Sequence, residues 1–216
     1  MIRLFCVVII SIGALLGADS TLIQPAGCDV TSIGQTGNKL PVLVKDAIKL
    51  VQKLPAAMVG DPGQLTAENV VVIGNMNKFF ACWAKNAPEV SDPKWQEDHR
   101  NTVFFTDRKY GIVFLNGERD AVRLGAQNYS NLEMRQRNMH LPYQFAAYLS
   151  HELGHLHGDK GESGPLSIQV VVLQYFQKQG KLPPAIQEEI NYTADLAERY
   201  RKAEFAGATL VAAKPE

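Results

Sequence analysis

The sequence lacks several compositional features that mark particular classes of protein. It has 3 cysteines in 216 residues, too few for a disulfide scaffold or an all-cysteine zinc site. Neither charge sign is in excess, because 22 Lys and Arg balance 22 Asp and Glu. That balance argues against a nucleic-acid-binding protein and gives no reason to expect an acidic membrane partner. Hydrophobic residues make up 46%, so we expect a folded core, in one domain at this length.

The one long uncharged run lies at the N-terminus. It covers residues 4–16, follows Arg3, and precedes the small residues Gly17 and Ala18. This arrangement predicts a secretory signal peptide over residues 1–18 that is cleaved after Ala18. The run is shorter than the roughly 18–20 residues that span a bilayer. We therefore expect a secreted or periplasmic protein without stable membrane insertion after cleavage, with an uncleaved anchor as the alternative.

Cleavage would remove Cys6 and leave Cys28 and Cys82. In an oxidising compartment two cysteines this far apart can close a long loop and stabilise the fold. We predict a Cys28–Cys82 disulfide, and two separate buried thiols are the alternative.

Apolar periodicity predicts the main elements of the chain. Residues 19–40 are rich in Gly, Ser, Thr and Gln and are expected to be a loose N-terminal segment, followed by a single domain over residues 41–216. Residues 101–106 and 110–115 flank a short polar link and indicate a β-hairpin. Polar residues 88–100 indicate a surface loop. Helices are expected over 41–54, 76–85, 141–158, 165–179 (or a strand) and 185–205, and a strand over 70–73. The expected fold class is α+β, helix-rich with a small sheet or hairpin.

Three of the five histidines lie within residues 151–157. His151 and His155 are four residues apart on a predicted helix, so they share one face and can both bind one Zn²⁺. Glu152 lies beside them and can accept a proton from metal-activated water. On a helical wheel the apolar stripe falls on a different side from the two histidines. The pattern is the HExxH arrangement of a zinc metallopeptidase, with His157 expected at the rim.

A catalytic zinc needs a third protein ligand and an open position. The metzincin extension would place that ligand six residues after His155, where this sequence has Gly161. A later helix offers Glu189, which falls near its inward stripe on the wheel. We expect Glu189 to be the third ligand; the alternatives are Asp159, Glu162 and Glu188.

The run HELGHLH at residues 151–157 resembles the zincin metallopeptidases. Together with residues 189–196 it loosely resembles the ImmA/IrrE-like gluzincins. The resemblance covers only these two motifs. It implies a zincin-like fold in which an edge strand lies beside the active helix and an extended peptide can add to it. It also implies Glu189 as the zinc ligand.

We therefore expect an exported zinc metallopeptidase that hydrolyses peptide bonds in a peptide or protein substrate. Glu152 would be the general base, and Tyr192, Tyr200 or Tyr143 would donate a hydrogen bond to the oxyanion. One alternative is a catalytically silent zincin-like protein that binds a metal or a partner. Another is an exported interaction domain in which the motif is accidental.

Overall fold

The computed structural model describes residues 27–85 and 87–207. The predicted signal peptide and residues 19–26 lie outside these ranges. Among the described helices, none has both the length and the apolar character needed to cross a membrane.

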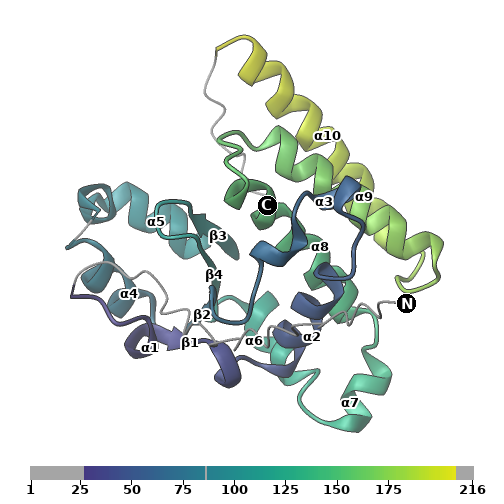
Figure 1. Ribbon diagram of the computed structural model, residues 1–216, viewed down its shortest axis with the longest axis horizontal. Helices are drawn as coiled ribbons and strands as arrows, with labels where there is room; N and C mark the ends of the chain where they lie inside the picture. Colours follow the sequence, from purple (N-terminus) through teal and green to yellow (C-terminus); the bar gives the residue numbers. More distant parts are fainter. Residues whose placement is uncertain (1–26, 86, 208–216) are drawn as a thin grey trace, which may run out of the picture.

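A mixed β-sheet of four strands is central to the fold (Figure 1). Its order is β1 (Gly34–Gln35), β2 (Val70–Ile73), β4 (Ile112–Asn116) and β3 (Phe104–Asp107). β2 and β4 are parallel, and the other two pairs are antiparallel. Every residue of β2 and β4 is buried, which explains why all of them except Asn116 at the end of β4 are apolar. β3 forms an edge of the sheet.

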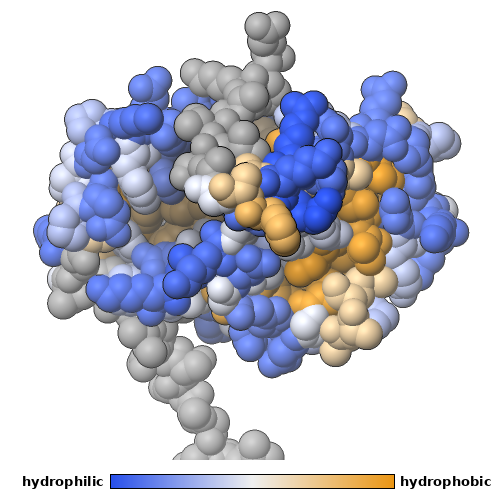
Figure 2. Space-filling model, turned by 90° about the horizontal axis from the view of Figure 1, so that it is seen from above, coloured by the Kyte–Doolittle hydropathy of each residue, from blue (hydrophilic) through white to orange (hydrophobic). Residues whose placement is uncertain are grey.

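The two faces of the sheet support two parts of the core, because successive strand residues point to opposite sides. Val70, Val72, Val113 and Leu115 pack with the larger set of helices: α2 (Val42–Val51), α8 (Leu141–Leu156), α9 (Ser163–Lys178) and α10 (Ile186–Phe205). Val71, Ile73, Ile112 and Phe114 pack on the other side with α1 (Val30–Ile33) and α4 (Met76–Trp83). In Figure 1, α9 lies along α8, and α10 runs beside α9. The face seen in Figure 2 is largely hydrophilic, with an apolar area right of centre.

The predicted α+β class is confirmed, as are its main elements. The strand at 70–73, the hairpin, and the helices over 41–54, 76–85, 141–158 and 185–205 are all present, each within a few residues of its expected bounds. The packing element expected to begin at Pro165 is helical and begins at Ser163. Shorter helices and 3₁₀ turns complete the chain: α3 (Ala56–Val59), α6 (Asp120–Gln127), α7 (Leu132–Arg137), Gly37–Lys39 and Pro62–Gln64.

The surface loop predicted for residues 88–100 is wrong. This segment forms a 3₁₀ turn, Pro88–Ser91, and then helix α5, Pro93–Asn101. The Asp92 side chain accepts a hydrogen bond from the Lys94 amide, and Pro93 occupies the first helical position, so the helix begins with a strong cap. Its polar sequence concealed it, because Trp95 is one of very few apolar residues that anchor it.

Residues 27–40 are not a loose segment. They form α1 and the edge strand β1, and Cys28, Val30 and Ile33 are buried in the core. The predicted disulfide between Cys28 and Cys82 is present and ties this segment to α4, with 5.2 Å between the two Cα atoms. A structural disulfide of this kind indicates an oxidising, extracellular type of compartment.

We predict that the Cys28→Ala/Cys82→Ala double variant loses about 2–4 kcal/mol of unfolding free energy, because the bridge closes a loop with a sequence separation of 54. Urea unfolding monitored by circular dichroism measures the loss. A reductant should lower the stability of the wild type and leave the double variant unchanged. Equal stability of the wild type and the double variant in the absence of reductant would contradict the prediction.

Candidate functional site

Helix α8 carries the histidine pair. Phe145, Leu149 and Leu153 lie on its buried side, and each is at most 4% exposed. Packing of this side against the sheet, α2 and α9 fixes the rotation of the helix, so His151 and His155 face a cavity instead of the core. Their ring centroids lie 5.0 Å apart. The expected separation of an apolar side from a histidine side is confirmed.

A short loop brings Glu162 back to the histidines. The chain leaves α8 through Gly158, whose φ of 98° favours glycine, and enters α9 at Ser163. Glu162 Oε2 lies 3.3 Å from His151 Nε2, and Glu162 Oε1 lies 3.6 Å from His155 Nε2. Donor atoms of these three residues all lie within 4.8 Å of one another. No other group of three metal-ligating side chains in the described part of the chain does so.

The same loop orients His155. The Asp159 carbonyl oxygen lies 3.1 Å from His155 Nδ1, and the Asp159 carboxylate accepts a hydrogen bond from the Gly161 amide. A proton on Nδ1 leaves the Nε2 lone pair directed at the cavity, which is the arrangement that metal-binding histidines use. His151 Nδ1 is buried and has no hydrogen-bond partner among the described residues.

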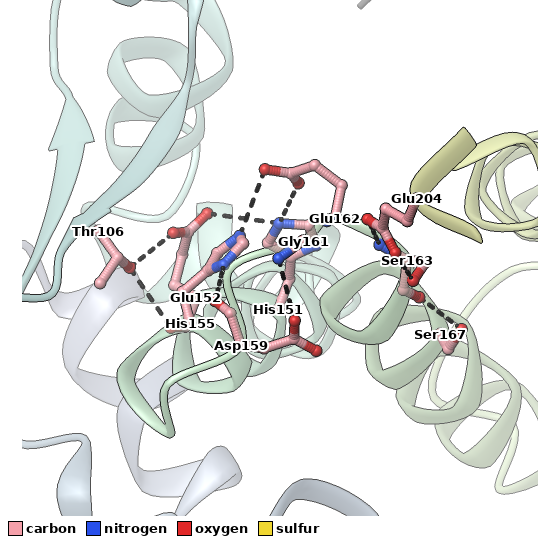
Figure 3. A network of polar contacts seen from close by, with 10 residues as sticks. All are labelled: Thr106, His151, Glu152, His155, Asp159, Gly161, Glu162, Ser163, Ser167 and Glu204. Carbon is pink, nitrogen blue, oxygen red and sulfur yellow. Dashed lines mark hydrogen bonds and ion pairs between the residues drawn. The ribbon is translucent and has the colours of Figure 1, made fainter. Parts of the chain in front are cut away.

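Glu152 is the buried acid of the site. It is 4% exposed, and its Oε2 accepts a hydrogen bond of 2.7 Å from the Thr106 hydroxyl of β3. Oε1 lies 4.0 Å from His151 Nε2. Burial raises the pKa of the Glu152 carboxyl, although the two histidines and the Thr106 bond oppose the rise. β3 and α8 are thus joined at the acid itself, as Figure 3 shows.

The mutual contacts of Glu162 and His155 shift both groups toward their charged forms. Burial raises the pKa of Glu162, but hydrogen bonds to His151 and His155 outweigh it and hold the pKa well below its usual range. Burial likewise lowers the pKa of His155. Its contacts with Glu162, Glu152 and the Asp159 carbonyl prevail and raise the pKa to about 9.

These residues open onto a cavity of about 550 Å³ between β3 and the helices. Phe104 and Thr106 line the strand side, and Leu166, Leu196 and Tyr200 line the side of α9 and α10. A second cavity, of about 380 Å³, continues past β3 toward α4 and α5. The two share four lining residues, His99, Phe105, Thr106 and Arg108, so they form one cleft across the edge strand.

The prediction of Glu189 as the partner of the histidine pair is wrong. Glu189 does face inward, but its carboxylate accepts hydrogen bonds of 2.7 Å from Tyr148 Oη and 2.8 Å from Gln144 Nε2. Tyr148 precedes His155 by seven residues, or about 10 Å along a helix. The helical wheel indicated the correct side of α10 but could not show which turn of α8 that side would meet.

The three candidate oxyanion donors differ in whether they line the cavity. Tyr192 is 54% exposed and does not line the cavity, and Tyr143 packs its ring on Phe176. Tyr200 lines the cavity together with Glu152 and Glu162. Burial, followed by the charge of Glu162, raises the pKa of Tyr200, so its hydroxyl keeps its proton at neutral pH.

Sequence reasoning missed the role of Thr106 and ranked Glu162 below Glu189. The one available signal for Glu162 was local: two glycines, Gly161 and Gly164, flank it just before a helix start. Such a loop can turn sharply and return a side chain to the helix it has left. Thr106 carries no local signal, because its partner lies 46 residues away.

No family model, curated protein or solved structure matches this chain. The resemblance to the zincins therefore rests on the two short motifs alone. The chemistry of the site has to be argued from its own donor atoms, which are two imidazole nitrogens and a carboxylate facing one cavity.

We predict that Thr106→Val lowers the unfolding free energy by about 1.5–3 kcal/mol, because it removes a hydrogen bond to a buried carboxyl group while keeping the side-chain shape. Thr102→Val is the matched control. Its hydroxyl bonds the exposed Asp98 carbonyl, and its loss should stay within about 0.5 kcal/mol. Chemical denaturation of both variants measures the difference, and equal losses would contradict the prediction.

Proposed function

We propose that this protein is a zinc-dependent peptidase whose metal is held by His151, His155 and Glu162. The observation that carries the proposal is the spacing of the donor atoms. Two ligands at about 2.0–2.1 Å from one tetrahedral zinc lie about 3.4 Å from each other. The imidazole–carboxylate distances here are 3.3 and 3.6 Å. Two histidines and one glutamate are also a donor set of catalytic zinc sites.

Glu152 is the general base of the proposed reaction. A zinc ion bound there would supply a Lewis acid that polarises a carbonyl and makes water acidic near neutral pH. Glu152 accepts a proton from water and delivers it to the leaving amine. The Thr106 hydroxyl holds Oε2, so the free Oε1 faces the histidines. A raised pKa brings Glu152 closer to the neutral range in which a carboxylate both accepts and returns a proton.

The edge strand supports a peptide as the substrate. Among the described strands β3 pairs with β4 alone, and residues of β3 line the cavity beside Glu152. An extended peptide can add to such an edge through main-chain hydrogen bonds. Tyr200 faces the same cavity and is the proposed hydrogen-bond donor to the developing oxyanion.

For the ligand set, we predict that Glu162→Ala weakens zinc binding strongly and that Glu189→Ala leaves it unchanged, because only Glu162 reaches the histidines. Wild type should bind one equivalent of zinc, and His151→Ala should lose it. Competition with a chromophoric chelator measures each affinity. Tight binding by Glu162→Ala together with loss in Glu189→Ala would restore Glu189 as the ligand.

For catalysis, we predict that Glu152→Gln keeps one equivalent of zinc and loses about 10²–10⁴-fold in peptide hydrolysis, because the amide cannot accept the proton. Atomic absorption gives the zinc content, and cleavage of a mixed peptide library followed by mass spectrometry gives the activity. Hydrolysis by Glu152→Gln at the wild-type rate would refute the proposed peptidase activity of this site. Zinc binding by a wild type that cleaves no peptide would support a silent metal-binding protein.

A further inference from the structure

The N-terminus of α9 is capped by a residue from another helix. Glu162 is the N-cap residue of α9, yet its side chain makes no capping hydrogen bond. The first amides of a helix lack intrahelical acceptors, and a short polar side chain at the N-cap usually accepts a hydrogen bond from one of them. The Glu162 carboxylate faces His151 and His155 instead.

Glu204, in the last turn of α10, takes over the capping. Its Oε1 accepts hydrogen bonds of 2.8 Å from the Glu162 amide and 3.2 Å from the Ser163 amide, and Oε2 accepts one from the Ser163 hydroxyl. Gly161 allows this approach, because a Cβ there would overlap the Glu204 carboxylate. Figure 3 shows Glu204 reaching from α10 to the loop that carries Glu162.

The carboxylates of Glu162 and Glu204 thus have separate roles around one short loop. A carboxylate at a helix N-terminus is favoured by the helix dipole and by the free amides. With Glu204 in that place, the Glu162 and Ser163 amides have an acceptor while the Glu162 carboxylate faces the imidazoles. Without Glu204, these two amides would lose their acceptor, and the backbone that carries the Glu162 carboxylate would lose its attachment to α10.

We propose that Glu204 is a positioning residue for the metal site, which acts by capping α9 so that the Glu162 carboxylate stays directed at His151 and His155. The proposal rests on the proposed function, since it assigns Glu162 as a zinc ligand. Glu204 touches neither histidine in the contacts described, and it would not bind the metal.

The test is a double-mutant cycle on zinc affinity in the full chain, measured by chelator competition. Glu204→Ala should weaken zinc binding about 10- to 100-fold, the usual cost of losing a residue that supports a metal ligand. In a Glu162→Ala background the same change should alter affinity by less than about twofold, because its effect passes through Glu162. Glu204→Gln keeps one acceptor oxygen and should recover part of the affinity.

Two further measurements make the cycle specific. Glu198→Ala is the matched control: Glu198 lies on the same helix and, within residues 27–85 and 87–207, pairs with Arg201 and Lys202 alone, so zinc affinity should not change. The visible spectrum of the Co²⁺-loaded protein should shift in Glu204→Ala and stay as in wild type in Glu198→Ala, because the spectrum reports ligand geometry. Should Glu204→Ala fail to fold, Gly161→Ala displaces the Glu204 carboxylate sterically and should also weaken binding.

The outcomes separate the two proposals. If wild type binds no zinc, or Glu162→Ala binds as tightly as wild type, the metal site fails and the positioning role fails with it. If Glu162→Ala weakens binding but Glu204→Ala and Gly161→Ala both bind like wild type, only the positioning role is overturned. Equal weakening by Glu204→Ala in both backgrounds also overturns it, since that result indicates a general structural effect.

Discussion

The burial of one side of α8 is the constraint on which the candidate site depends. Phe145, Leu149 and Leu153 are removed from water between the sheet and the neighbouring helices, each contributing roughly 1.5–3 kcal/mol. Any rotation of α8 that moved His151 and His155 would expose these side chains. The hydrophobic core therefore fixes the direction of two polar residues that make no part of it, and the cavity in front of them is a consequence of that packing.

This arrangement buries a charged group, which is unfavourable without compensation. Glu152 is buried, and a buried carboxylate is stable only when hydrogen bonds and opposite charges compensate for lost solvation. Thr106 supplies a hydrogen bond from the edge strand, and the histidines supply positive charge when protonated. Glu162 adds a second carboxylate on the open side of the cavity. Two carboxylates around two imidazoles make a cluster that favours a cation, be it a proton or a metal ion.

Much of this structure follows from local sequence, and the remainder does not for identifiable reasons. β2 and α8 have strong periodicities, and their limits were predicted within two residues. The helix α5 was not predicted, because few apolar residues anchor it. The pairing of Thr106 with Glu152 and the approach of Glu162 to the histidines depend on tertiary packing or on loop geometry that no periodicity encodes. Glu189 was placed on the correct face of α10, but its axial position relative to α8 was unknown.

The correction from Glu189 to Glu162 changes what the last helix contributes. With Glu189 as ligand, α10 would have supplied a metal-binding atom directly. Glu162, the ligand under the proposed function, instead comes from a short loop whose two ends are held separately. At the α8 end, Asp159 contacts both His155 and Gly161; at the α9 end, Glu204 of α10 holds the backbone of Glu162. A loop anchored at both ends loses little conformational entropy when its carboxylate binds a cation. α10 therefore contributes to the site by supporting the loop that carries Glu162, and not through Glu189.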